Sequence, residues 1–416
     1  MQYDDLFVSL DMGSSKVSVT LCGELAGDDR LYLLARSEVP TDGLRKGVVI
    51  DIERTARAVN QAMKEVEAAT DVKIESATVS VAGGHIRSMN TTGVVAVPGA
   101  GVTSNDVRRC IESAKSQAIP ADREVIHSLP QSYTVDSHEG VREPVGMAGR
   151  RLEARVHVVT ASVNAIQNVI RSVKKAGFEV EDVVLEPLAS AYSVLDADEK
   201  DLGVCVVDLG SGTTDLAIYS QGELKHTQVI GVGGDQLTRD LSSELLTPVK
   251  EAERIKQEVG DALPHRVEEG DLVEVPSVGG RASRRLERRH IAELIEVRLS
   301  VLFERVRRAI QDSGYAAALG GGVVLTGGGA NLHGVTGLAE RVLDLPVRRG
   351  VPRRLENRTE LLIGPETAVG VGLCQYARHH LHDAGVVLRR HRHVDGETTG
   401  FFKITKRLRE LISGSA

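Results

Sequence analysis

Two apolar runs separated by a glycine-rich turn form the clearest pattern in the chain. Residues 203–207 are rich in valine and predict a buried strand, and residues 216–219 predict a second strand after the turn. The turn itself, residues 208–215, reads Asp-Leu-Gly-Ser-Gly-Thr-Thr-Asp. Glycines let backbone N–H groups approach a polyphosphate closely, and successive N–H groups form a concave anion site. Taken alone, the stretch also fits an ordinary glycine-rich hairpin.

A carboxylate in such a turn needs a separate explanation. Asp208 cannot attract phosphate, because like charges repel, and it makes most sense as a ligand of a hydrated Mg²⁺ that accompanies the phosphates. The same plan of strand, Asp-x-Gly-Ser and second strand recurs over residues 6–21. Two similar loops so far apart in one chain predict a duplicated domain with one phosphate-binding loop in each half.

The rest of the chain, to about residue 378, alternates strands and helices as α/β domains do. Apolar spacing predicts helices at 52–69, 163–176, 187–192, 236–246, 252–259, 288–312 and 337–343, and a last one after Gly364. Strands are predicted at 74–82, 155–161, 180–185 and 272–275. Residues 85–155 interrupt this alternation with short apolar groups and turns. They predict a small inserted α+β subdomain with one helix at 104–118.

A third glycine-rich turn and two helices of small residues complete the candidate site. Gly327, Gly328 and Gly329 follow a strand and suit close packing of backbone against a purine or ribose. The helices that begin near Pro187 and Gly364 are rich in alanine, glycine and serine. Side chains of this size permit tight contact between two helices, which predicts a hinge between the halves.

The C-terminal tip is short and sharply two-faced. At about 100° per residue its apolar and basic side chains fall on opposite sides, which predicts an amphipathic helix. A basic amphipathic helix after a polar linker fits an interfacial membrane anchor, with cations meeting anionic head groups. Packing against the body or in a partner's groove is the alternative. The predicted membrane contacts are Phe401, Phe402, Ile404, Lys406, Arg407, Leu408, Leu411 and Ile412.

Composition narrows the classes of function. Aromatic residues make up 3% of the 416 residues, tryptophan is absent and the formal net charge is −7, all of which argue against a nucleic-acid-binding protein. The four cysteines are scattered, as expected of core residues in a reducing compartment. No apolar run reaches the roughly 20 residues that span a bilayer. Membrane contact is therefore expected to be peripheral.

The paired Asp-x-Gly loops, the Thr-Gly-Gly-Gly-Ala turn at 326–330 and the two small-residue helices together resemble the actin-like ATPase superfamily over residues 6–378. Within it, the chain is similar to the FtsA family of bacterial cell-division actin homologues. The insertion, Gly233-Gly234-Asp235 with Thr238, and the amphipathic tip favour that family. The tip lacks tryptophan and residues 260–290 are irregular, which departs from the family pattern.

The resemblance implies an α/β, actin-like (ribonuclease-H-like) duplicated two-domain ATPase fold with an inserted α+β subdomain. It divides the chain into subdomain 1A (1–84, 156–202 and 364–378), the inserted subdomain 1C (85–155), subdomain 2A (203–246 and 320–363), subdomain 2B (247–319), a flexible linker (379–400) and an amphipathic membrane-targeting helix (401–412).

The resemblance also implies ATP and Mg²⁺ between the halves. Asp11 and Asp208 would hold the metal through water, and Glu186 would orient or activate water, although a helix cap explains its position before Pro187 equally well. Lys16 would supply positive charge where phosphoryl charge develops. The implied nucleotide contacts are Gly13, Ser14, Ser15, Lys16, Gly210, Ser211, Gly212, Thr213, Thr214, Gly234, Glu253, Lys256, Gly327, Gly328 and Gly329.

The function implied in this way is a self-associating, ATP-binding adaptor in cell division. It would anchor the tubulin-like protein FtsZ to the cytoplasmic side of the bacterial cell membrane at the division site and recruit later division proteins. Nucleotide would govern conformation and assembly, with slow hydrolysis if any. The FtsZ C-terminal tail would dock on the subdomain that carries the long helix, where Arg298 is the best single candidate.

Two other functions share the fold. A PilM-like adaptor of pilus assembly generally lacks the terminal amphipathic helix, so residues 401–412 discriminate against it. A sugar or acetate kinase needs a catalytic acid in a substrate cleft, and no extra loop of this chain supplies one. Both remain alternatives to the cell-division function at this stage.

Overall fold

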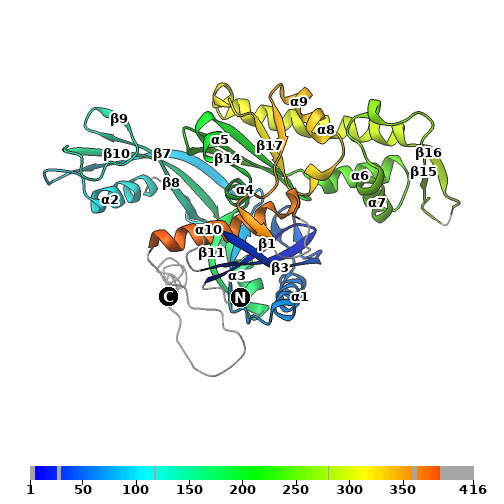
Figure 1. The fold of residues 1–416 in the computed structure, drawn as a ribbon, viewed down its shortest axis with the longest axis horizontal. Helices are drawn as coiled ribbons and strands as arrows, with labels where there is room; N and C mark the ends of the chain where they lie inside the picture. The colour runs from blue at the N-terminus through cyan, green and yellow to red at the C-terminus, as the bar shows by residue number, and fades with distance from the viewer. Residues whose placement is uncertain (1–4, 26–29, 117–118, 280, 358–362, 385–416) are drawn as a thin grey trace.

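The computed structural model describes residues 5–25, 30–116, 119–279, 281–357 and 363–384. Its first half is built on a six-stranded sheet of order β11-β6-β1-β2-β3-β19 (Figure 1). These strands are β1 (Asp5–Met12), β2 (Lys16–Glu24), β3 (Leu31–Pro40), β6 (Ser76–Val81), β11 (Glu179–Leu185) and β19 (Leu355–Asn357). A small hairpin of β4 (Leu44–Arg45) and β5 (Val48–Val49) follows β3.

The second sheet repeats the topology of the first. Its order is β14-β13-β12-β17-β18, from β12 (Val204–Leu209), β13 (Thr214–Ser220), β14 (Glu223–Ile230), β17 (Val323–Thr326) and β18 (Val347–Arg349). β12 pairs antiparallel with β13 and parallel with β17, as β1 pairs with β2 and β6. The next strands outward keep the same directions. The predicted duplicated α/β architecture is therefore confirmed.

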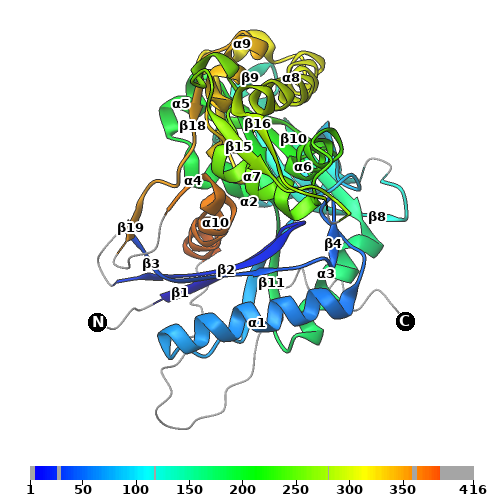
Figure 2. The same cartoon turned by 90° about the vertical axis from the view of Figure 1, so that its right-hand side faces the viewer.

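Helices α1 (Ile52–Thr70) and α3 (Val163–Lys175) pack together on one face of the first sheet (Figure 2). The Asp51 side chain accepts a hydrogen bond from the Arg54 N–H and begins α1. Val59, Ala62 and Met63 then fall on one side of the helix and are fully buried. The apolar residues of α1, predicted from their spacing of about 3.6 residues, thus form the face of the helix that covers the sheet.

Helices α4 (Glu186–Val194) and α10 (Ala368–Ala384) lie between the two sheets. They touch through backbone, because a Cβ on Gly372 would lie 1.8 Å from the Ala189 carbonyl oxygen. Ser193 Oγ also donates to the Ala368 carbonyl at 2.8 Å. The predicted linker from residue 379 is wrong in its first part, since α10 continues through residues 379–384. Residues 385–416, including the predicted membrane helix, lie outside the described residues.

The insertion folds as a separate four-stranded sheet of order β7-β10-β8-β9 with helix α2 (Ser104–Lys115) against it. Its strands are β7 (Arg87–Ala96), β8 (Arg123–Val135), β9 (His138–Val141) and β10 (Arg151–Ser162). The strand predicted at 155–161 for the main sheet is the second part of β10, which pairs with β7 and β8. The insertion therefore runs several residues beyond the predicted end at 155.

Four helices and a hairpin share one core with the second sheet: α6 (Gly234–Glu244), α7 (Val249–Val259), α8 (Arg288–Asp312), α9 (Val335–Leu343), and β15 (Leu272–Val275) with β16 (Arg284–Glu287). The other described elements are α5 (Ala197–Leu202), which buries none of its residues, and the short 3₁₀ turns Pro264–Arg266, Ala316–Ala318, Gly328–Asn331 and Pro365–Thr367. β19 was predicted within the second half, at 320–363, but pairs with β3 of the first sheet. Within the described ranges, no helix is long and apolar enough to cross a membrane.

Candidate functional site

Three parallel strands of the first sheet end at one edge and bring three polar side chains together. β1 pairs with β6, and β6 pairs with β11, in registers that place Asp11, Ser80 and Glu186 at neighbouring strand ends. Ser80 Oγ lies 2.9 Å from Asp11 Oδ1 and 3.3 Å from Glu186 Oε1, so its hydroxyl can donate to either carboxylate. Ligand sites of open α/β sheets form at this end of the strands.

The second half contributes an equivalent edge. Asp208 lies opposite Thr326 of the parallel strand β17 and accepts a hydrogen bond from Ser190 Oγ at 2.6 Å. Gly327 follows with a φ of 79°, and a Cβ there would lie 2.1 Å from Asp208 Oδ1. Glycine is required because the backbone passes directly beside the carboxylate. Asp215, across the hairpin from Asp208, accepts a hydrogen bond from the Thr213 hydroxyl at 2.7 Å.

A cavity of about 130 Å³ lies between these two edges. The structure brings most of the predicted site residues to its wall: Asp11, Gly13, Ser14, Ser15, Lys16, Glu186, Asp208, Gly210, Ser211, Gly212, Thr213, Gly327 and Gly328. The two phosphate loops predicted from the sequence face each other so closely that a Cβ on Gly212 would lie 2.4 Å from Ser14 Oγ. One loop from each half therefore meets at a single cavity.

Two other predicted nucleotide residues support the cavity from behind. Thr214 is fully buried and donates its hydroxyl hydrogen to the Val232 carbonyl at 2.9 Å. Gly329 packs against Leu209, from which a Cβ would stand only 2.8 Å away. Neither lines the cavity, and both fix the loops that do.

Glu253 and Lys256 of α7 form a neighbouring cluster rather than part of the cavity wall. Lys256 Nζ lies 2.7 Å from Glu253 Oε2, 2.9 Å from Thr238 Oγ1 and 3.4 Å from the Gly234 carbonyl oxygen. The Gly234 N–H in turn donates to the Gly210 carbonyl at 2.9 Å. This predicted base and ribose region therefore adjoins the second phosphate loop through its backbone.

The cation predicted to face the phosphates has a protein partner. Lys16 lines the cavity, but its Nζ lies 2.5 Å from Glu38 Oε1 on β3. Arg36 also pairs with Glu38. A phosphate at this wall would share the ammonium with that carboxylate.

Arg298, the predicted partner residue, lies elsewhere. It projects from α8 and pairs with Asp240 and Glu244 of α6 at 3.5 and 3.4 Å. Its side chain is 44% exposed, so its guanidinium remains accessible on this surface. The structure therefore separates the predicted partner contact from the cavity.

Three carboxylates that line the cavity, Asp11, Glu186 and Asp208, and their neighbour Asp215 have raised pKa values. Burial raises the pKa of Asp208 to about 6 and that of Asp215 to about 8. Burial, reinforced by the negative charge of the other three, raises the pKa of Glu186 well above its usual value. Burial also raises the pKa of Asp11, and outweighs its hydrogen bond from Ser80. Each shift marks a carboxylate that would be stabilised by a nearby cation.

This donor set fits a divalent cation that keeps its water ligands. Hydroxyl groups lie within hydrogen-bond distance of all four carboxylates, and Asp215 Oδ1 is buried with no hydrogen-bond partner among the described residues. Among the described residues no three His, Cys, Asp or Glu side chains converge to ligate a metal directly. Mg²⁺ is typically held by one or two carboxylates, waters and phosphate oxygens, which is compatible with this geometry. Gly328 leaves room for a ligand, because a Cβ there would meet nothing within 4 Å.

Sequence reasoning missed four residues of this site. Ser80 and Ser190 donate to the predicted metal ligands, Asp215 adds a buried carboxylate, and Glu366 lines the cavity while accepting a hydrogen bond from an asparagine. Ser190 could have been found, since it stands four residues after Glu186 on the same helix face. Ser80 gives no such local signal, because its neighbours in space come from other strands.

Comparison with known proteins decides the family. A family model described as "Cell division protein FtsA" matches residues 205–372, and one described as "SHS2 domain inserted in FTSA" matches residues 83–160. The chain is 46% identical to the Cell division protein FtsA of Pseudomonas aeruginosa over 376 residues, which cover 90% of each chain. The chain belongs to the FtsA family. It is also 37% identical to the FtsA of Escherichia coli K12, over 92% of this chain and 93% of that one.

The FtsA family assignment agrees with the architecture. The SHS2 match ends at residue 160, close to the end of β10, so the insertion includes the strand that was predicted for the main sheet. Among solved structures, the PilM-PilN type IV pilus biogenesis complex covers 90% of this chain and 99% of that chain, with a TM-score of 0.65 and 18% identity. The structure of MreB5 of Spiroplasma citri bound to ADP covers 91% of this chain and 98% of that chain, with a TM-score of 0.56 and 15% identity. At such identities the likeness concerns the actin-like fold alone.

Proposed function

We propose that this FtsA-family protein binds ATP with Mg²⁺ in the cavity between its halves and uses the nucleotide to control self-association. The proposal is carried by one observation: two glycine-rich loops, one from each half, meet around a group of buried carboxylates. The solved structure of MreB5, which shares the fold, is described as bound to ADP. The bound nucleotide would supply a phosphoanhydride and, with Mg²⁺, a link between the two halves.

Each residue has a distinct task in this proposal. Asp11 and Asp208 hold the hydrated metal. The two carboxylates are themselves oriented by hydrogen bonds from Ser80 and Ser190. The backbone of the two loops surrounds the phosphates. Glu186 is oriented toward the cavity by its place at the start of α4, where it can position water. Burial and the neighbouring carboxylates raise the pKa of Glu186, and a bound cation would lower it again by favouring the charged carboxylate.

The cellular role in the proposal is that of an adaptor. Residues 401–412 attach the protein to the cytoplasmic face of the membrane, and the surface around Arg298 takes the C-terminal tail of FtsZ. A single short amphipathic helix binds weakly, so side-by-side assembly would strengthen attachment through multivalency. Recruitment of later division proteins follows from such an assembly at the division site.

Nucleotide binding is tested by titrating a fluorescent ATP analogue with and without Mg²⁺. We expect Asp208→Asn to lose most of the Mg²⁺-dependent part of the affinity, because it removes a charged metal contact. Asp312→Asn, at the exposed end of α8, is the matched control and should bind like the wild type. Unchanged Mg²⁺ dependence in Asp208→Asn would remove the metal assignment.

Membrane attachment is tested by co-sedimentation with vesicles. Full-length protein should pellet with vesicles that contain anionic lipid, more so with ATP, and a truncation before Phe401 should stay in the supernatant. Vesicles of neutral lipid control for the electrostatic part. If the truncated protein still pellets with anionic vesicles, the anchor lies elsewhere.

A further inference from the structure

The tip of the β4–β5 hairpin has an unusual backbone. Its two turn residues, Lys46 and Gly47, have φ angles of 50° and 73°. Two consecutive positive φ angles are typical of a type I′ turn, which favours Asn, Asp or Gly at its first position. A lysine there is less favourable because of its Cβ, and such a conformation persists where the surrounding structure holds it in place.

This tip lies where the two phosphate loops meet. The Gly47 N–H donates to Ser14 Oγ of the first loop at 2.9 Å, and Gly47 lines the central cavity. On the second loop, a Cβ on Gly212 would lie 2.9 Å from the Cα of Lys46. The hairpin belongs to the first half, so its tip crosses the interface and touches the second.

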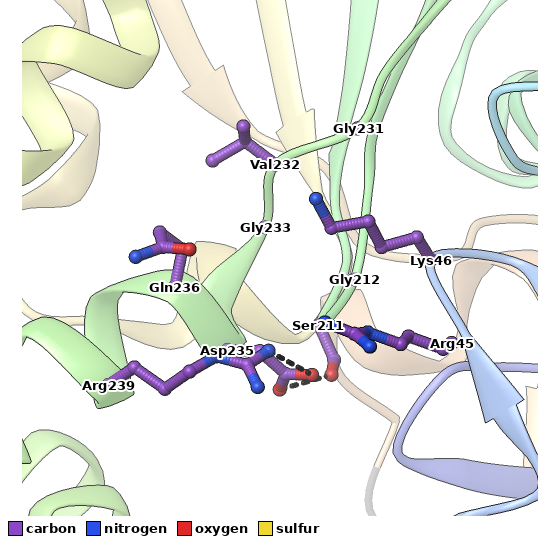
Figure 3. Close-up of a pocket in the computed structure, with 10 residues that line it drawn as sticks. All are labelled: Arg45, Lys46, Ser211, Gly212, Gly231, Val232, Gly233, Asp235, Gln236 and Arg239. Carbon is purple, nitrogen blue, oxygen red and sulfur yellow. Dashed lines mark hydrogen bonds and ion pairs between the residues drawn. The ribbon is translucent and has the colours of Figure 1, made fainter.

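Positive charge gathers on the outer side of the second loop. A small cavity there, of about 20 Å³, is lined by Arg45, Lys46, Arg239 and the glycine-rich backbone of residues 211–212 and 231–233. Figure 3 shows the Lys46 side chain extending past Gly212 toward Gly231, and Arg45 beside Ser211. Arg239 is paired with Asp235 at 3.8 Å.

Lys46 differs in its pairing from Lys16, the cation of the first loop. In the part of the chain that the structure describes, Lys46 has no ion pair and its side chain no hydrogen bond, whereas Lys16 is held by Glu38 at 2.5 Å. The Lys46 ammonium therefore makes no direct ion pair with a carboxylate of the described residues, although Asp235 lines the same small cavity. The ammonium stands against a loop whose opposite side lines the cavity that would hold the polyphosphate.

We infer that Lys46 is a positioning residue that closes the second phosphate loop on the bound nucleotide. The inference rests on the proposed nucleotide site and assigns to it a residue outside the glycine loops. The Lys46 ammonium stabilises the second loop in its closed position. It also offsets part of the negative charge of the polyphosphate, which lies on the other side of the glycine-rich backbone of that loop. Because the hairpin comes from the first half, the same contact couples nucleotide binding to the approach of the halves.

The test separates this role from a structural one. Lys46→Asn places a favoured residue in the turn, so its melting temperature without nucleotide should equal or exceed that of the wild type. Its affinity for a fluorescent ATP analogue should fall about tenfold, which is about 1.4 kcal/mol. Lys46→Arg keeps both the less favourable backbone and the charge and should bind within a factor of about two of the wild type. The loss in Lys46→Asn should shrink between 50 and 200 mM salt, since screening weakens the lost attraction.

The outcomes are distinguishable from failure of the proposed function. Lys115→Asn, on helix α2 of the insertion, controls for loss of one positive charge at a distance. If the wild type binds the analogue and Lys46→Asn binds equally well, the inference is overturned while the nucleotide site stands. If Lys46→Arg binds as poorly as Lys46→Asn, a charge role is refuted. If the wild type itself does not bind, the proposed site fails and the inference falls with it.

Discussion

The contact between α4 and α10 allows a sharp prediction about Gly372. A methyl group there would lie 1.8 Å from the Ala189 carbonyl oxygen, 2.5 Å from its carbonyl carbon and 3.3 Å from its Cα. Ordinary contact begins near 3.4 Å, and the atoms in the way are backbone. Gly372→Ala must therefore move one helix relative to the other.

The magnitude follows from two opposing effects. Overpacking of a core costs about 1–3 kcal/mol, and a backbone neighbour places this site near the upper end. Alanine regains about 1 kcal/mol of helix propensity over glycine. The free energy of unfolding should thus fall by about 2 kcal/mol. At about 2–4 °C per kcal/mol for larger domains, the melting temperature should fall by about 4–8 °C.

The assay compares thermal unfolding of Gly372→Ala with that of a matched variant, Gly337→Ala in α9. There the methyl group would meet only the Leu263 Cδ1 at 3.1 Å, the end of a flexible side chain, so we expect no loss or a small gain. Gly372→Ala should also weaken nucleotide binding, because α4 carries Ser190 and its hydrogen bond to Asp208. If Gly372→Ala unfolds at or above the wild-type temperature, the tight helix contact does not exist as described.

Two further predictions concern protons. Asp215 has a pKa of about 8 and Asp208 a pKa of about 6, so both are partly protonated near neutral pH and binding of Mg²⁺ with nucleotide should release protons. Calorimetric titration at pH 7 in two buffers of different ionisation enthalpy measures this release. Binding heats that do not depend on the buffer would contradict it. Burial lowers the pKa of His157 from 6.5 to about 4. Between these two pH values the His157 imidazole is therefore protonated in the unfolded chain but neutral in the folded protein. Stability should hold above pH 6.5 and fall by up to about 3 kcal/mol as the pH drops toward 4. Urea unfolding at pH 7 and 5 checks the fall, which should be smaller in His157→Gln.

The sequence predicts the loops of this site well because their signal is local. Asp11 and Asp208 each end an apolar strand and open a turn of glycines and hydroxyls, and both face the cavity. The long helix predicted at 288–312 coincides with α8, since nine of its residues bury one continuous apolar face. Patterns of this kind depend on neighbours within one or two turns of chain, which the sequence contains directly.

What the sequence does not predict depends on partners that are distant along the chain. The alternation at 155–161 indicates a strand, but nothing in it distinguishes the main sheet from the inserted one, where β7 and β8 provide the hydrogen bonds. β19 likewise returns to the first sheet after the chain has left the second. Lys16 follows the first loop directly, yet the position of its ammonium is determined by an ion pair with Glu38 on a neighbouring strand.

The insertion and the cavity are linked through β14, and this link limits how the halves can move. The chain leaves the first sheet to form the insertion, but the insertion's side chains hydrogen-bond to the second half. Ser88 Oγ donates to the Thr227 carbonyl at 2.8 Å and Gln131 Nε2 to the Leu224 carbonyl at 2.8 Å. β14 is the edge strand of its sheet, so its outer edge can accept these hydrogen bonds from the insertion.

The position of these bonds along β14 gives them a further consequence. The strand ends at Ile230, and the next residues, 231–233, line the cationic side of the second phosphate loop. A rotation that opens the central cavity must therefore either carry the insertion with the second half or break its bonds to β14. The insertion is covalently part of the first half. If it moves with the second half, the chain must bend at its connections to the first half, near residues 83–87 and 160–163. Opening of the cavity is thus coupled either to movement of the insertion or to loss of its hydrogen bonds to β14.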